Sequence, residues 1–454
     1  MAAATRVRAA NGPVAGADAV VPRPAPGRGS LGPVRLQQLV LAEVAAAVVF
    51  TAWVAARPLL VPAAVLAAVL VLLALARKGR RPVTEWLTAA AALRERARRA
   101  AAEPVAVGTD PRLAPFVECE PALRTGSFSA AGSAGPGTVG PGSATAGSAP
   151  AGSATDGGQR TVGVVGDGTF LTAVLRVEAV DRPLRADRVA GSMPLGLLRD
   201  VMDIDDIRLE SVQVVQTALP APAPHLPAQA LAAANYAPLQ ALTGAPAVRQ
   251  TWVALKFDPE LCPRAVEARG GGVAGAQRCL LRAADQLASR LRGAGFTAAP
   301  LSEDEVVAAL AAAADVNPAA TAQAALASTP ARRTAETARA WRCDDRWHTT
   351  YWVSRWPRLG AGGAPLPQLA ALLTSLPALS TTLSLTLGRG RTLNGRHAPT
   401  LTGHVRICGR SADELTGLGR ELERMARAVK AGLVRLDQEQ VPGVLATLPL
   451  GGTR

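Results

Sequence analysis

Two long apolar segments stand almost end to end near the start of the chain. They run from Leu36 to Ala56 and from Leu59 to Ala76, and only Arg57 and Pro58 separate them. At a rise of about 1.5 Å per residue, each makes a helix of roughly 27–31 Å, which matches the hydrocarbon core of a bilayer. We therefore predict a transmembrane hairpin over residues 36–77, with helices at about 36–56 and 59–76. This interpretation is favoured over a signal peptide or a buried core hairpin.

The segments on either side of the hairpin have a different composition. Residues 1–35 form a basic tail that we expect to be mostly disordered, and residues 78–123 predict a basic juxtamembrane helix, at about 83–101, followed by a connector. From 124 to 160 the chain consists mainly of Gly, Ser, Ala, Thr and Pro. Such side chains build no core, so this stretch predicts a disordered linker.

Folded structure is expected to resume at Thr161 and to continue to the end of the chain. Residues 161–180 predict a β-hairpin turning at Asp167-Gly168, because this dipeptide tolerates the positive φ angles of a tight turn. Residues 251–258 predict a central strand, and apolar side chains at helical spacing predict a long helix over 275–292. The fold class is thus α+β: the transmembrane hairpin is followed by a mixed α/β cytosolic domain over 161–454.

The remaining elements of this domain follow from local signals. Two capping-box patterns, Ser302 with Glu305 and Ser411 with Glu414, begin helices that we expect to reach Ala314 and Leu433. The other predicted elements are short helices at 194–201 and 366–373, strands at 207–217, 381–387 and 401–408, a hairpin at 340–356 and an apolar tail at 441–450.

Charge decides the expected topology. The formal net charge is +14, and the basic excess is concentrated on the two flanks of the hairpin, where Arg80 and Arg81 follow the second apolar run. The positive-inside rule then places both termini and the main domain on the cytoplasmic side of the cell membrane, where anionic lipids are partners. Nucleic acid is not an expected partner, because no aromatic-lined basic groove or standard motif is present. The five cysteines form no CxxC pair, which fits a reducing compartment and predicts no metal site.

One cluster offers candidate chemistry. Cys343, Asp344, Asp345 and His348 lie within a few residues, and all four side chain types serve as metal ligands or acid and base groups. An Asp-Asp pair is also what the tip of a hairpin requires, and we favour that interpretation. Asp203, Asp205 and Asp206 lack the glycine and the distal glutamate of a calcium loop. We predict no catalytic residue, no cofactor and no enzyme activity.

Interaction residues are predicted instead. Trp347, Trp352 and Trp356 are concentrated in one hairpin, where tryptophans act more often as core or interface anchors than as a substrate platform. Glu43 is the one acid near the membrane core; it either pairs with a basic or polar partner or lies at the membrane interface, and the sequence leaves both open. Arg80 and Arg81 complete the set of candidates.

The arrangement of segments resembles the EccE component of actinobacterial type VII (ESX) secretion systems. Three stretches carry the resemblance: TVGVVGDGTFLTAVLRVE at 161–178, WHTTYWVSRWP at 347–357 and VRLDQEQVPGVLATLPLG at 434–451. It implies a non-catalytic, membrane-anchored subunit that scaffolds the translocon beside EccB, the EccC ATPase and EccD, with no small-molecule substrate. The absence of a Walker motif agrees with energy supplied by EccC.

Two other functions compete with this interpretation. The first is a membrane-anchored enzyme that acts on a lipid-linked or nucleotide-linked substrate through Asp344, Asp345 and His348. The second is a cytosolic adaptor that recruits secretion cargo through an exposed tryptophan hairpin around Trp352.

Overall fold

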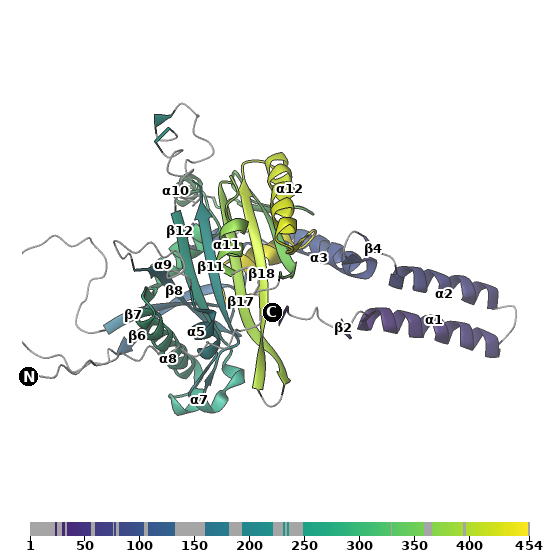
Figure 1. Cartoon of the computed structure of the whole chain (residues 1–454), viewed down its shortest axis with the longest axis horizontal. Coiled ribbons are helices and arrows are strands. Elements are labelled where there is room, and N and C mark those ends of the chain that lie inside the picture. Colours follow the sequence, from purple (N-terminus) through teal and green to yellow (C-terminus); the bar gives the residue numbers. More distant parts are fainter. Residues whose placement is uncertain are drawn as a thin grey trace, which may run out of the picture.

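The computed structural model describes residues 23–24, 30–31, 34–55, 60–75, 77–78, 81–103, 108–131, 159–180, 193–220, 230–231, 234–235, 248–327, 329–357, 366–393 and 396–452. A helical hairpin projects from a sheet domain that has helices on both faces (Figure 1). The predicted α+β class is confirmed for these residues.

The hairpin consists of helices α1, Leu36–Ala55, and α2, Leu60–Leu75, which run side by side (Figure 1). Both begin and end within one residue of their predicted positions. In the part of the chain that the structure describes, no helix has the length and apolar character that crossing a membrane requires. The predicted two-span topology is therefore not confirmed. The basic helix predicted at 83–101 is present as α3, Val83–Ala102.

A large, mostly antiparallel sheet forms the centre of the domain. Its strand order is β14-β15-β16-β18-β17-β11-β12-β8-β7-β6; β13 also pairs with β8, β19 with β16, and β1 in parallel with β18. The bounds are β1 Arg23–Pro24, β6 Arg124–Ala131, β7 Gln159–Gly166, β8 Leu171–Ala179, β11 Ser211–Leu219, β12 Val248–Phe257, β13 Phe296–Pro300, β14 Thr334–Glu336, β15 Trp341–Cys343, β16 Arg346–Arg355, β17 Ser380–Leu393, β18 Arg396–Gly409 and β19 Gly432–Arg435. Three two-residue pairs lie apart from it: β2 Ser30–Leu31 with β3 Val34–Arg35, β4 Arg77–Lys78 with β5 Arg81–Pro82, and β9 Asp203–Ile204 with β10 Ile207–Arg208.

Helices cover both faces of this sheet and create two cores. The helices are α4 Ala114–Val117, α5 Leu195–Asp200, the 3-10 helix η2 Pro259–Leu261, α7 Pro263–Ala268, α8 Gly272–Gly293, α9 Glu303–Ala313, α10 Pro318–Leu326, α11 Leu366–Leu373, α12 Ala412–Ala428 and α13 Gln440–Thr447. Side chains of α5, α7, α8, α11 and α12 share one core, and those of α4, α9 and α13 share the other. On α8, Leu280, Leu287 and Leu291 are completely buried. Each contributes about 1.5–3 kcal/mol by the area that it removes from water.

Several local signals produced the elements that they predict. The hairpin of β7 and β8 turns at Asp167-Gly168; Gly168 has a φ of 94°, and the Asp167 carboxylate accepts the N–H of Thr169 at 2.8 Å. Ser302 and Glu305 form both arms of a capping box at the start of α9. β12 lies between β11 and β8, as expected of a central strand.

Three expectations about this domain were wrong. The predicted linker at 124–160 contributes two strand segments: β6 pairs with β7 from Arg124 with Gly166 to Ala131 with Gln159, so backbone hydrogen bonds give order to a sequence with few core side chains. Residues 132–158 lie outside the described part. The helix expected to reach Leu433 ends at Ala428, because Lys430 adopts a φ of 60°, and the chain then forms β19. The single strand expected at 207–217 is divided into β10 and β11.

The C-terminal segment closes one face of the sheet through buried polar contacts. The side chain amide of Gln213 on β11 donates to the carbonyl of Ala446 at 2.9 Å, and its oxygen accepts the N–H of Gly451 at 2.7 Å. Ser384 donates to the same Ala446 carbonyl at 2.8 Å, and Thr172 donates to the Leu450 carbonyl at 3.0 Å. The tail predicted at 441–450 therefore forms α13 and belongs to the folded domain.

Candidate functional site

Strand β14 is the place where the helix that follows the hairpin is attached to the sheet domain. Arg96 of α3 forms a two-point ion pair with Glu336 of β14, at 2.8 and 3.0 Å, and also donates to the carbonyl of Gln438 at 2.7 Å. Glu336 additionally accepts the backbone N–H of Val441 at 2.9 Å. One carboxylate therefore links α3 to the segment that begins α13. Paired bonds of this kind fix direction as well as distance.

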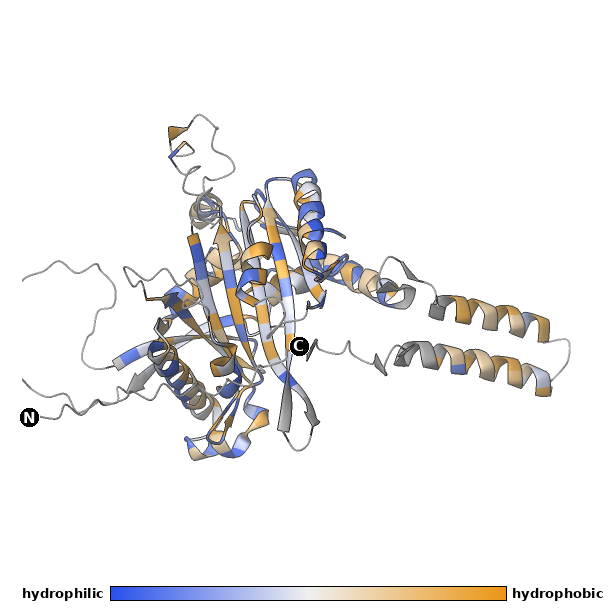
Figure 2. Cartoon of the chain, in the orientation of Figure 1, coloured by the Kyte–Doolittle hydropathy of each residue, from blue (hydrophilic) through white to orange (hydrophobic). Residues whose placement is uncertain are grey.

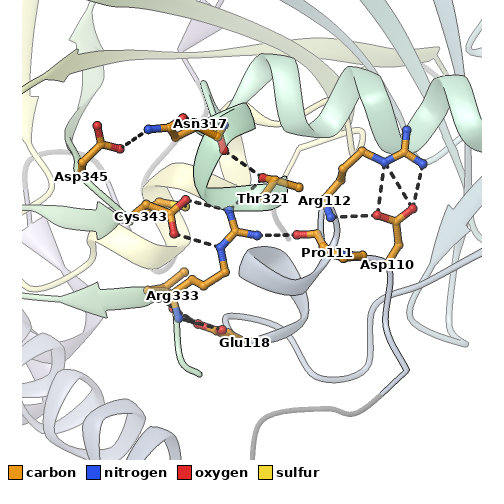
Figure 3. Close-up of polar contacts among 12 residues, drawn as sticks. Asp110, Pro111, Arg112, Glu118, Asn317, Thr321, Arg333, Cys343 and Asp345 are labelled. Carbon is orange, nitrogen blue, oxygen red and sulfur yellow. Dashed lines mark hydrogen bonds and ion pairs between the residues drawn. The ribbon is translucent and has the colours of Figure 1, made fainter. Parts of the chain in front are cut away.

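A second attachment lies at Arg333, the residue directly before β14, where the connector after α3 meets the strand. Arg333 forms a two-point ion pair with Asp344, at 2.9 and 2.7 Å, and donates to Thr321 at 2.9 Å and to the carbonyl of Pro111 (Figure 3). Its backbone N–H donates to the carboxylate of Glu118 at 3.0 Å. Arg333 thus joins the connector, α10 and the turn between β15 and β16.

The same glutamate also holds the neighbouring residue. Thr334 donates to Glu118 from its backbone N–H at 2.9 Å and from its hydroxyl at 2.7 Å. We refer to Arg96, Glu118, Arg333, Glu336 and Asp344 as the β14 junction. Arg96, Glu118, Arg333 and Glu336 contact residues more than 100 positions away, whereas Asp344 pairs with Arg333, 11 positions away.

Burial makes the ion pair at the centre of the junction costly to break. The side chain of Arg333 is 7% exposed and that of Asp344 10% exposed. The hydrogen bond to Asp344 raises the pKa of Arg333 against the opposing effect of burial, so the guanidinium stays charged. Removing one partner would leave an uncompensated buried charge, which typically costs about 3–5 kcal/mol.

The structure disperses the cluster that was considered for catalysis. Asp344 faces Arg333, whereas Asp345 accepts a hydrogen bond from Asn317 at 2.8 Å (Figure 3). The side chain of His348 is buried, and the centroid of its ring lies 5.0 Å from that of the Trp341 ring. Burial, aided by two nearby arginines, holds the pKa of His348 well below its usual value, so the imidazole is neutral. Among the described residues, no group of three His, Cys, Asp or Glu side chains is arranged to hold a metal ion.

The other acids singled out in the sequence have structural partners. Asp203 pairs with Arg389 at 2.7 Å, Asp206 with Arg269 at 2.7 Å and Asp205 with Arg282 at 3.4 Å. Asp205 also adopts a φ of 53° in the turn between β9 and β10. These contacts agree with the turn interpretation of the three residues.

The tryptophan candidates all lie on or directly after β16, and all three are half-buried. Trp347 and Trp356 pack against the core that contains α8, and the Arg342 guanidinium lies 5.8 Å from the Trp347 ring. In the register of the sheet, Trp352 lies opposite His404 of β18 and opposite Val434 of β19. These side chains therefore do not form the exposed tryptophan surface that an adaptor requires.

The remaining candidates belong to the hairpin and its flank. Glu43 is exposed on α1. Arg80 lies outside the described residues, and Arg81 begins the two-residue strand β5, with a side chain outside the described part. Most residues of both helices are apolar (Figure 2), and several large apolar side chains are exposed: Phe50 is 63% exposed, Trp53 66% and Leu72 65%.

Of the five residues of the β14 junction, only Asp344 stands out in the sequence, as part of the Cys343–His348 cluster. Arg96, Glu118, Arg333 and Glu336 are charged residues in ordinary surroundings, with no motif at a fixed spacing. Arg96 stands among other charged residues and Arg333 directly follows Arg332, so nothing in the sequence separates them from solvated neighbours. Their function as junction residues depends on contacts that span up to 342 positions.

These features define the class: an α+β protein whose sheet domain is fastened to an apolar helical hairpin. Residues 245–353 match the model of one family, EccE, described as a putative type VII ESX secretion system translocon. The match begins just before β12, contains α8 and ends within β16, so it includes Arg333, Glu336 and Asp344. The resemblance to EccE is confirmed over this segment. No curated protein matches the chain.

Proposed function

We propose that this chain is a non-catalytic scaffolding subunit of the type VII secretion complex, with EccB, the EccC ATPase and EccD as its partners. The match of residues 245–353 to the EccE translocon family is the observation that carries the proposal. The dispersal of Asp344, Asp345 and His348 supports a structural function for the hairpin that bears them. In this function the chain stabilises the translocon, and the ATPase supplies the energy.

The proposal places the α1–α2 hairpin in the cell membrane and the sheet domain on its cytoplasmic side. It is supported by the two apolar segments from Leu36 to Ala76 and by the exposed apolar side chains of both helices. The basic flank that contains Arg80 and Arg81 favours cytoplasmic placement and contact with anionic lipid. On α3, Arg98 and Arg99 are 75% and 69% exposed, so they are accessible to lipid head groups.

The β14 junction gives this subunit a mechanical function. Arg96 and Glu336 tie α3 to the start of α13, and Arg333 ties the connector to the turn of the adjacent hairpin. Two attachments, one on β14 and one at the residue before it, restrict rotation of the juxtamembrane helix more than either one alone. The junction would therefore hold the membrane hairpin and the sheet domain in a defined relative orientation.

Affinity purification of the tagged full-length chain from its native host in mild detergent tests the proposal. Mass spectrometry is expected to identify EccB, EccC and EccD in constant ratio with the chain. Asp345→Ala is a suitable control, because this exposed residue of the dispersed cluster should leave recovery unchanged. Purification of the chain alone would contradict the proposal. Loss of partners in Asp345→Ala would instead support a chemical function for the hairpin that bears Asp345.

A further inference from the structure

The two helices of the hairpin leave an apolar groove between them. It has a volume of about 560 Å³ and is lined by Ala42, Ala45, Ala46, Phe50 and Trp53 of α1 and by Ala67 and Val71 of α2, among others. Along α1 the lining alanines lie toward one end of the groove, and the aromatic pair, with ring centroids 6.3 Å apart, lies at the other. Small side chains allow a third helix to approach closely enough for backbone packing.

A single charge lies at the margin of this groove. On a helix with 3.6 residues per turn, Glu43 is about 60° around the axis from Ala46 and one turn before it. Glu43 is exposed, and within the described chain it forms no ion pair. An ionised carboxylate beside an apolar surface is costly unless a cation or a hydrogen-bond donor reaches it.

The charge pattern excludes a second copy of this chain as the occupant. Neither α1 nor α2 contains a lysine, arginine or histidine, so another hairpin of the same sequence has no cation to place beside Glu43. Two copies would instead bring two like charges to one apolar contact, which is unfavourable at low dielectric. Lipid chains would fill the volume but would leave the carboxylate without a partner at the same depth.

We infer that the groove receives one apolar helix of a different subunit, and that this helix carries a lysine or arginine opposite Glu43. The small residues supply the close packing and the single acid sets the depth and identity of the occupant. This inference rests on the proposed function, because it names the kind of partner that the hairpin binds. It identifies Ala46 and Glu43 as the residues that select that partner.

Photocrosslinking in the native host tests the identity of the occupant. A benzophenone amino acid at Ala46 of the full-length chain is expected to give an adduct with a different membrane protein. Val44, which is 44% exposed and lies on the opposite side of α1, is the matched control position and should give little of that adduct. A homodimer adduct, or an adduct with lipid alone, would overturn the inference.

Two substitutions separate this inference from the proposed function. Ala46→Phe fills the groove and should reduce recovery of the crosslinked subunit about tenfold, since overpacking an occupied interface is strongly unfavourable. Glu43→Lys should reduce it as well, whereas Val44→Phe should not. If the wild-type chain recovers its partners and both groove variants do so equally, the groove inference is wrong and the proposed function stands. If the wild-type chain recovers none, the proposed function itself is wrong.

Discussion

The hairpin and the sheet domain use the same apolar residue types in opposite ways. In the sheet domain, helix α8 alternates buried leucines with exposed arginines, so its apolar face is covered within the chain (Figure 2). In α1 and α2 apolar residues surround each helix, and Val61 and Trp53 remain 73% and 66% exposed. A helix that is apolar all round needs a covering from outside, as lipid or as protein. The apolar face of α8 is therefore covered within the chain, whereas much of the apolar surface of the described hairpin is not.

The largest effect is expected where the two regions are joined. Arg333→Met should lower the free energy of unfolding by about 4 kcal/mol, because it leaves the carboxylate of Asp344 buried without its cation. Urea denaturation of the full-length chain in detergent, monitored by tryptophan fluorescence, measures this change in the free energy of unfolding. Arg332→Met is the control, since the neighbouring side chain is only partly buried and should change stability by less than about 0.5 kcal/mol. Equal effects of the two substitutions would show that Arg333 does not carry the junction.

A matched pair of leucines compares the two regions directly. Leu280→Ala on α8 should cost about 3 kcal/mol, because it opens a cavity at a completely buried position. Leu66→Ala on α2, where the leucine is 50% exposed, should cost less than about 0.5 kcal/mol in the same denaturation experiment. A large loss from Leu66→Ala would mean that the hairpin contributes to the core of the domain, which would remove the contrast.

Acid should weaken the sheet domain through two of its histidines, His348 and His404. Burial lowers the pKa of His404 to about 4 and that of His348 well below 6.5, so both stay neutral in the folded state while the unfolded chain binds protons below pH 6.5. Stability is therefore present above pH 6.5 and is lost as the pH falls toward 4, by about 1 kcal/mol for each histidine at pH 5.5. Denaturation midpoints between pH 7.5 and 5.5 measure the slope. His404→Gln should reduce it, and an unchanged slope in that variant would contradict the assignment.

The smallest effect on stability is expected at the outer attachment of the junction. Arg96→Met should cost about 1 kcal/mol, because Arg96 is 26% exposed and Glu336 keeps its hydrogen bond from the Val441 N–H after the substitution. A double-mutant cycle with Glu336→Gln should give a coupling energy of about that size. Arg94→Met, on the same helix but exposed, is the control. Zero coupling would show that α3 is held by other contacts.

Much of the fold was accessible from local pattern. The starts of α1, α2, α3, α9 and α12 were predicted within a residue or two, because apolar periodicity and capping residues act over one or two turns. β6 was missed, since a strand of Gly, Ser and Ala carries no pattern and gains order only from pairing with β7. The end of α12 was also missed, because the φ of Lys430 and the pairing of β19 with β16 depend on the assembled sheet.

The candidate site was much less accessible. The sequence indicated that Asp344 lies at a hairpin tip, but no local signal connects it to Arg333, and none connects Arg96 to Glu336 across 240 positions. Ion pairs of this kind form where the fold brings two surfaces together, so any exposed acid or base in the chain was an equal candidate.

By itself the sequence determined the apolar hairpin, the basic helix that follows it, the capped helices and the resemblance to EccE, because each is written in contiguous residues. Only the tertiary structure decided which apolar surfaces are covered and which charges are paired. It buried Leu280, Leu287 and Leu291 of α8 and left Leu66 and Leu72 of α2 exposed. It also directed Arg333 to Asp344 and Glu118. The physical reason is that burial and ion pairing belong to contacts between distant segments, whose energies are defined only once the sheet has brought them together.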